Sequence, residues 1–299
     1  MKRYMVNVTR SILALMLIFS YNPVVLIAQE NTEAGVMVKE KPVKNTFGSN
    51  WCMDNQTVMV PIKGTMEMTI QHRFGTVKNG AEDLIGIFAP SNIRLGMAYA
   101  PINNLMVGAG ITKERMQLDF NAKYGLLKQT PGSMPVSLTY FGNIVFDLRN
   151  KSNFRYPVHR MSYFNQLIVA RKITDKLSVQ VSPTFSWFNN VEAYFDKNGD
   201  VQKKMKNGHL AISTYGRYKL NDKFAITAGY DQPLTAHTTN NPLPNICFGF
   251  EVTTSAHAFQ VFMGNYYGIV PQSNNMFNQN DYTKGQFLIG FNITRLWNY

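Results

Sequence analysis

Apolar and polar residues alternate with a period of two along most of the chain. Between positions 177 and 187 the even positions hold only Ser, Gln and Thr, whereas the odd positions hold Leu, Val, Pro, Phe and Trp. This is the period of a β-strand, because successive side chains of a strand point to opposite faces of its sheet. Similar segments recur between turn residues and predict an all-β protein of about twelve strands. The predicted strands are 65–74, 91–99, 104–112, 115–125, 135–147, 160–173, 176–188, 208–220, 223–231, 245–254, 257–265 and 285–297.

The predicted strands have the length and the connections of membrane-spanning strands. Each has about 9 to 14 residues, and a tilted strand needs about 9 to 11 to cross a bilayer. Tight turns such as 101–103 and 174–175 alternate with connections of about 11 to 20 residues, which is the outer-membrane pattern. We therefore expect a transmembrane antiparallel up-and-down β-barrel with both termini periplasmic. A soluble barrel, with the apolar side chains inside, is the alternative.

The composition agrees with a membrane protein that has few charged residues and only a moderate content of hydrophobic ones. Charged residues make up 16% of the 299 residues, against about 25% in an average soluble domain. The 45% of hydrophobic residues excludes a disordered chain. Two cysteines are too few for a disulfide framework of this length.

The first residues predict export. Lys2, Arg3 and Arg10 precede and flank an apolar run at 12–19, and Ala28 ends a second apolar stretch, as in a cleaved signal peptide. We expect three parts: 1–28 signal peptide, 29–64 periplasmic N-terminal segment, and 65–299 outer-membrane β-barrel. The predicted location is the outer membrane.

Several blocks of the mature chain resemble an uncharacterised family of predicted bacterial outer-membrane β-barrel proteins. The resemblance covers about residues 36 to 299. It implies a barrel in the outer membrane and no activity, because the family is a domain of unknown function. The blocks include Gln71-His72-Arg73-Phe74-Gly75, Pro90-Ser91-Asn92-Ile93-Arg94, Asp231-Gln232-Pro233-Leu234 and Phe291-Asn292-Ile293-Thr294-Arg295-Leu296-Trp297.

Charged residues on the polar face of the predicted strands would line the lumen. Their modest excess of cations favours a passive pore for small solutes, with anions preferred. The alternative is that these charges pair across the wall and fill the barrel. A closed structural or binding barrel would then present extracellular loops or dock a periplasmic partner through 29–64. The predicted lumen charges are Arg73, Arg94, Asp119, Lys123, Asp147, Arg217, Lys219 and Glu251.

The connection 265–285 is rich in both amides and large apolar side chains. Such a loop is unusual in water, so we expect it to fold into the barrel mouth and constrict it. The alternative is an external turn whose aromatics join the outer girdle. The predicted constriction residues are Tyr266, Tyr267, Asn274, Asn275, Phe277, Asn278, Asn280 and Tyr282.

The expected partners are those of an exported barrel. Outer-membrane lipid would cover the wall, and lipopolysaccharide suits the lysine cluster of 197–206 on a predicted external loop. The aromatic end of the chain, Trp297 and Tyr299, is typical of the signal read by the barrel-assembly machinery. Nucleic acid is excluded as a partner of an exported barrel.

No enzyme signature stands out. His-Glu-x-x-His, Gly-x-Ser-x-Gly and Cys-x-x-Cys-His are all missing from the sequence, so we expect no catalytic residue, no metal site and no cofactor. An outer-membrane enzyme is therefore the least favoured function. Cys52 and Cys247 are the two cysteines, and whether they pair stays open.

Overall fold

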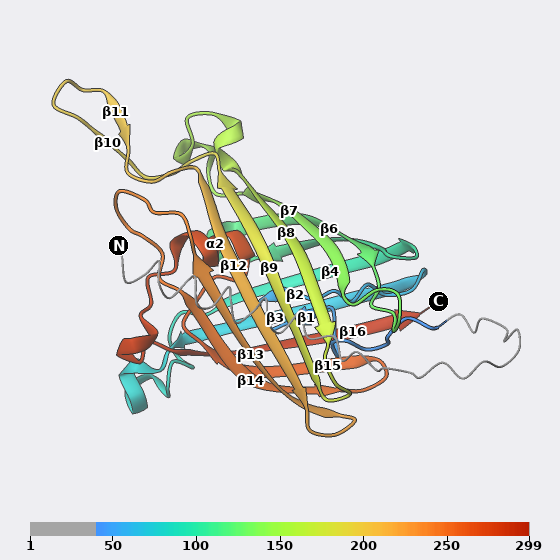
Figure 1. Cartoon of the computed structure of the whole chain (residues 1–299). Helices are drawn as coiled ribbons and strands as arrows, with labels where there is room; N and C mark the ends of the chain where they lie inside the picture. Colours follow the sequence, from blue (N-terminus) through green and yellow to red (C-terminus); the bar gives the residue numbers. More distant parts are fainter. Residues whose placement is uncertain (1–39, 299) are drawn as a thin grey trace, which may run out of the picture. The chain divides into compact units, whose positions relative to one another are not determined.

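Twelve antiparallel strands close into a ring in the computed structural model, which describes residues 40–298 (Figure 1). Each barrel strand pairs with the next along the chain, and β16 pairs with β3 to close the ring. The predicted closed barrel is thereby confirmed. The predicted signal peptide and Tyr299 lie outside the described residues.

The observed strands match the predicted segments to within a few residues. The barrel strands are β3 Thr65–Thr76, β4 Asn92–Ile102, β5 Leu105–Thr112, β6 Gln117–Leu127, β7 Ser137–Asp147, β8 Met161–Lys172, β9 Leu177–Phe188, β12 Gly208–Lys219, β13 Phe224–Pro233, β14 Asn245–Thr253, β15 His257–Gly264 and β16 Leu288–Asn298. The remaining elements are the short strands β1 Trp51–Cys52, β2 Asn55–Gln56, β10 Ala193–Phe195 and β11 Val201–Lys203, the helix α2 Pro271–Phe277, and the 3-10 turns η1 Val77–Asp83, η2 Glu114–Met116, η3 Lys151–Asn153, η4 Pro157–Arg160 and η5 Tyr282–Lys284.

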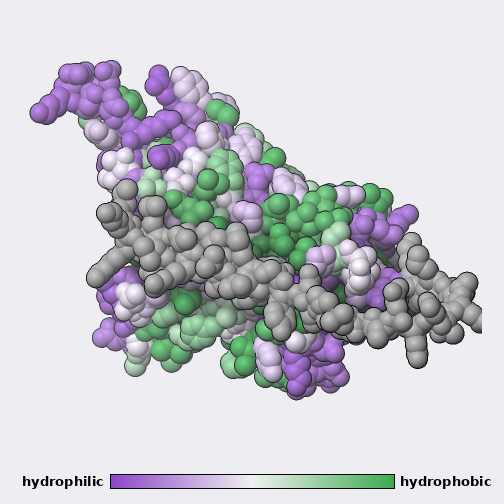
Figure 2. Space-filling model, viewed as in Figure 1, coloured by the Kyte–Doolittle hydropathy of each residue, from purple (hydrophilic) through white to green (hydrophobic). Residues whose placement is uncertain are grey.

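The apolar face of the wall points outward. In β9 every even residue from Ser178 to Phe188 is buried, and the odd residues are exposed or half-exposed. Hydrophobic residues cover the middle of the visible face, and hydrophilic residues gather toward its ends (Figure 2). This distribution suits a wall surrounded by lipid, since a soluble barrel would bury these side chains. Among the described residues, no helix is long and apolar enough to span a membrane.

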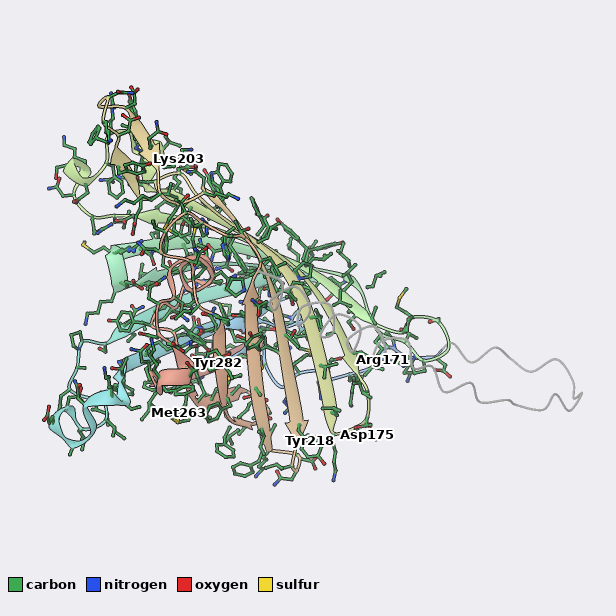
Figure 3. All side chains as sticks on the ribbon, turned by 60° about the vertical axis from the view of Figure 1, so that its left-hand side comes forward. Arg171, Asp175, Lys203, Tyr218, Met263 and Tyr282 are labelled. Carbon is green, nitrogen blue, oxygen red and sulfur yellow. The ribbon has the colours of Figure 1, made fainter. Side chains whose placement is uncertain are left out.

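The connections sort to the two ends of the barrel. The end that carries connections 103–104, 128–136, 173–176, 220–223 and 254–256 is called the turn end, and the opposite end the loop end. The loop end carries 77–91, 113–116, 148–160, 189–207, 234–244 and 265–287. Figure 3 shows Asp175 at the turn end and Lys203 on the β10–β11 hairpin beyond the loop end.

The lumen is filled from both ends by the chain itself. Residues 42–64, called the plug, start and finish at the turn end, where Val43 N–H donates to Gln129 O and Gly64 N–H donates to Ala100 O. Between these anchors residues 49–58 are buried, and β1 and β2 form a small hairpin. The structure thus differs from the expected segment 29–64 outside the barrel: from residue 42 onward it turns back into the lumen, whose polar wall supplies its hydrogen-bond partners. From the loop end, α2 enters the lumen.

We predict that arginine on the outer face is tolerated only near a strand end. Val181 lies mid-strand, opposite Thr214 and Val169, whereas Leu220 follows the last residue of β12. Val181→Arg should lower the free energy of unfolding in lipid vesicles by about 2–4 kcal/mol, and Leu220→Arg by about 0–1 kcal/mol, because a charge costs most at the bilayer midplane. Equal penalties at the two positions would contradict a lipid-facing wall.

Candidate functional site

A buried lysine of the wall binds the plug. Lys123, on β6, has no exposed surface, and its Nζ donates to Gln56 Oε1 at 2.7 Å. The same ammonium donates to the backbone oxygens of Asn50 at 3.3 Å and Thr57 at 3.4 Å. A buried cation is costly unless oxygens surround it. The plug therefore supplies the oxygen atoms that replace water around the Lys123 ammonium.

A buried arginine holds the tip of the plug. The guanidinium of Arg73, on β3, forms an ion pair with Asp54, in the turn between β1 and β2. Arg73 also donates to Asn292 Oδ1 at 3.0 Å and lies over the Phe262 ring at 4.5 Å. Because its charge is fully buried, removal of Asp54 would leave an unpaired cation inside the wall.

Side chains of the wall replace water for the plug backbone. Gln260 donates to Trp51 O at 2.8 Å and accepts from Met53 N–H at 3.1 Å. Asn292 donates to Met53 O at 2.7 Å, and Gln180 donates to Gln56 O at 2.8 Å. Buried backbone groups need such partners. The lumen wall is thus complementary to this one segment.

One side of the plug packs on an apolar patch inside the barrel. Phe47, Cys52, Met53 and Val58 join a buried cluster with side chains of the wall. The wall members are Phe141, Phe164, Ile168, Ala170, Tyr215, Cys247 and Phe262, with Tyr266 from the loop after β15. Apolar groups facing a lumen lose contact with water only when something covers them, and here the plug does.

The plug forms no ladder with the barrel. β1 pairs only with β2, Trp51 opposite Gln56 and Cys52 opposite Asn55, as a separate two-stranded sheet. Within the described part of the chain, every hydrogen bond and ion pair from the wall to residues 49–58 involves a side chain. Departure of residues 49–58 would therefore break no hydrogen bond of the barrel ladder.

Helix α2 closes the loop end above the plug. Asn274 donates to Asp54 Oδ2 at 3.1 Å, so the helix touches the tip of the plug. Asn275 donates to Thr184 Oγ1 at 3.2 Å and Gln272 to Ser162 Oγ at 3.3 Å, both on the wall. The plug and helix α2 thus form two successive layers across the lumen.

The predicted lumen charges separate into paired groups and rim groups. Inside, Arg94 forms a bidentate pair with Asp119 at 2.7 and 2.8 Å, and Arg217 pairs with Glu251 at 2.6 Å. At the rims, Asp147 pairs with Arg149 at the loop end and Lys219 with Asp222 at the turn end, each at 2.7 Å. The predicted set is therefore not one ring around an open pore. Of the predicted lumen charges, Arg73 has its carboxylate partner on the plug, and Lys123 has its hydrogen-bond acceptors there.

The predicted constriction residues differ in how far they are buried. Tyr266, Asn274, Asn275 and Asn278 are buried. Tyr267, Phe277, Asn280 and Tyr282 are half-buried, and the Phe277 ring lies 4.8 Å from that of Phe188. The structure thus brings the loop into the mouth, with the amides against plug and wall.

A cavity of about 890 Å³ lies at the turn end between plug and wall. Basic groups exceed acidic ones in its lining, which includes Lys44 and Lys223 with the pairs Lys172–Asp175 and Lys219–Asp222. The hydrogen bond and the charge of Lys219 hold the pKa of Asp222 below its usual value. Volume and charge suit a small anion.

The described residues contain no group of three or more His, Cys, Asp or Glu placed to hold a metal ion. At the loop end His209 Nδ1 and His237 Nε2 are 3.0 Å apart, and Lys206 N–H donates to His237 Nδ1. Because Nδ1 of His237 accepts a hydrogen bond, the ring hydrogen of His237 is on Nε2, which donates to Nδ1 of His209. Each ring thus has one nitrogen that accepts, so both rings are neutral. Burial, followed by the charge of Lys206, lowers the pKa of His237. The pair fastens 234–244 to the start of β12.

Sequence reasoning missed the plug. One signal was present: Phe141, Phe164 and Tyr215 fall on the polar face of their strands, where a water-filled pore has no use for aromatics. Those side chains indicate that something apolar fills the lumen, whereas the sequence points there only to the loop 265–285. Cys52 and Cys247, which belong to this cluster, are both free thiols.

Comparison with known proteins identifies a family. A family model described as "Membrane bound beta barrel domain (DUF5777)" matches residues 47–297. No curated protein matches the sequence. Among solved structures, the NanC porin is 11% identical, with 78% of this chain and 99% of that chain covered and a TM-score of 0.46. An outer membrane channel from Pseudomonas putida F1 is 10% identical, with 80% and 97% covered and a TM-score of 0.48. The CymD monoaromatic hydrocarbon channel is 7% identical, with 80% and 90% covered and a TM-score of 0.36. Likenesses this remote say nothing of what the present chain binds or transports.

We predict that Gly48→Val dislodges the plug and leaves the barrel intact. A Cβ at Gly48 would overlap the Glu251 carboxylate, which cannot move freely because Arg217 and Gln260 both donate to it. Such overpacking costs about 1–3 kcal/mol. Maleimide labelling of Cys52, 1% exposed, should accelerate roughly 5- to 150-fold.

Gly216→Val is the matched control, because a Cβ there meets no atom within 4 Å. It should leave the labelling rate unchanged. Slow labelling of the Gly48 variant, equal to that of the control, would show that Gly48 does not seat the plug.

Proposed function

The chain belongs to the membrane-bound beta barrel family DUF5777, and on that premise we propose that it is an outer-membrane channel for small solutes, closed by its own plug. In the described state the plug and α2 fill the path. Conduction requires the plug to leave the lumen toward the turn end, where both of its anchors lie. We place the turn end and both termini on the periplasmic side, because bacterial barrels have short periplasmic turns and longer extracellular loops.

The observation that carries this proposal is the separateness of the plug. Its hairpin pairs only with itself, and the barrel ladder closes without it. A segment needed only to complete the wall would be expected to share the ladder. Side-chain hydrogen bonds of about 0.5–1.5 kcal/mol each can exchange for bonds to water when the plug leaves.

The wall behind the plug is suited to water. The β9 face that points inward carries Ser178, Gln180, Ser182, Thr184 and Ser186, all buried. Within the described residues no group accepts or donates a hydrogen bond at Ser182 Oγ, Ser186 Oγ or Gln180 Oε1. The plug thus uses only part of the hydrogen-bonding capacity of the lumen, and a file of water or a polar solute would use the rest.

Withdrawal of the plug would expose two cations of the wall. Asp54 leaves with the plug, and the fully buried Arg73 loses its carboxylate partner. Lys123 loses its three plug oxygens at the same moment. The wall carboxylates Glu67 and Asp231 lose Asn50 and Asn55 of the plug as well, so the ion preference of the open lumen depends on how far they offset these two cations.

A closed barrel that presents its loops is the second candidate. The β10–β11 hairpin favours it, because all six of its strand residues are exposed and include Phe195 at 75% and Val201 at 63%. Exposed apolar side chains on a projecting hairpin suit contact with another molecule. A barrel of this kind needs no path through its lumen.

Planar-bilayer recording of four chains separates the two functions. The wild type should open rarely, and deletion of 46–58 or of 272–281 should raise the open fraction. Because plug and helix are barriers in series, only the double deletion should give sustained current steps. Circular dichroism and unfolding in vesicles establish that each chain is folded.

A folded double-deletion chain without current steps would exclude the channel and favour the closed barrel. Replacement of Arg73 and Lys123 by Gln in the double-deletion chain should reduce its preference for chloride over potassium. Conduction with an unchanged ion preference would retain the channel and refute anion selection by these two residues.

A further inference from the structure

The cavity at the turn end is bounded by the plug on one side and the wall on the other. From the plug come Lys44, Asn45 and Phe47, and from the turns of the wall come Lys223 and Ser255. Its volume of about 890 Å³ falls in the range of small-molecule sites, about 300–1,000 Å³. Any molecule held there contacts the movable and the fixed part of the barrel at once.

Charge selects the class of ligand. Lys172 and Lys219 are 3.6 and 2.7 Å from Asp175 and Asp222, and Arg217 is paired with Glu251. Among the described residues Lys44 and Lys223 form no ion pair, and Glu67, the one carboxylate of the lining outside these pairs, accepts a hydrogen bond from Asn50. One lies on the plug and one on the β12–β13 turn, so the surplus positive charge is divided between the two parts.

Other groups of the lining suit an organic anion better than a bare ion. Thr253, Thr254, Ser178 and Asn45 supply hydrogen-bonding groups, and Phe47, Met59 and Leu296 supply apolar surface. Carboxylate or phosphate groups would meet the lysines, and the carbon skeleton would meet the apolar side chains. The chemical class is a small, multiply charged organic anion.

We propose that this cavity binds such an anion and that the bound anion keeps the plug in place. Its contacts with Lys44 exist only while the plug is seated, whereas Lys223 is present in both states. A ligand stabilises the state in which it has more contacts. The anion therefore closes the barrel, and its removal favours opening. The inference rests on the proposed movement of the plug and adds the ligand that regulates it.

Thiol labelling measures this effect without any current. Cys52 and Cys247 are the two cysteines of the chain, and both are buried between plug and wall. A maleimide should reach Cys52 only after the plug leaves. Citrate serves as the probe, and calorimetry on the detergent-solubilised full-length protein gives its Kd. At a citrate concentration ten times Kd, labelling should slow by up to about tenfold, because the ligand binds the closed state more tightly than the open one.

Two matched double variants locate the site. Lys44→Gln with Lys223→Gln should weaken citrate binding at least tenfold and abolish the slowing. Lys203→Gln with Lys204→Gln removes the same charge from the exposed β11 end of the hairpin and should change neither. An effect of the same size in both double variants would refute this cavity as the site.

The remaining outcomes are also decisive. No heat of binding, unchanged labelling with citrate bound, or faster labelling would each overturn the proposal. A barrel that conducts nothing and yet shows the slowing would refute the channel and retain the anion site. A conducting double-deletion chain with no citrate effect in the full-length protein would refute the anion site alone.

Discussion

Charges inside a narrow barrel need partners, and the plug supplies three oxygen acceptors to Lys123 and a carboxylate to Arg73. Both side chains are fully buried on the inner face of the wall, and both bind groups between Asn50 and Thr57. The effective penalty of burying an unpaired ion is several kcal/mol. Without the plug these two cations would need water, so their burial depends on the plug.

The same contacts are compatible with the proposed opening of the filled lumen. Wall amides such as Gln260 and Asn292 satisfy the plug backbone as water would. The apolar cluster around Phe47 and Met53 adds attraction without strand pairing. Each contact is modest, and none belongs to the hydrogen-bonded ring that resists unfolding in the membrane. Stability of the barrel and occupancy of its lumen are therefore separate quantities.

The barrel could be predicted from the sequence because the alternation of apolar and polar residues lies within each strand. In β9 the alternation of Ser182 and Thr184 with Val181 and Phe185 reports which face each residue occupies, and repetition of that pattern gives the strands. The burial of the predicted lumen charges Arg94, Asp119 and Glu251 follows from the same period. Pairing of these charges was one of two alternatives, because alternation places a residue on a face without naming its partner.

The plug could not be predicted because its residues bind partners far away in the sequence and show no periodic pattern of apolar and polar positions. Asn292 binds Met53 across 239 positions, and Gln260 binds Trp51 across 209. A stretch such as Trp51-Cys52-Met53-Asp54-Asn55-Gln56 mixes polar and apolar residues without alternation, so it indicates neither strand nor helix. The partial indication was on the wall, in the inward-facing Phe141 and Phe164, and those residues identify a filled lumen without identifying what fills it.

Hydrogen exchange of the lipid-reconstituted protein tests the plug most directly. Amides of 49–58 should exchange more slowly than those of the exposed β10–β11 hairpin and faster than those of β9, because the plug is covered yet leaves without unfolding of the barrel. Exchange as fast as in the hairpin would contradict a plug inside the lumen. Exchange as slow as in β9 would contradict a plug that moves independently of the wall.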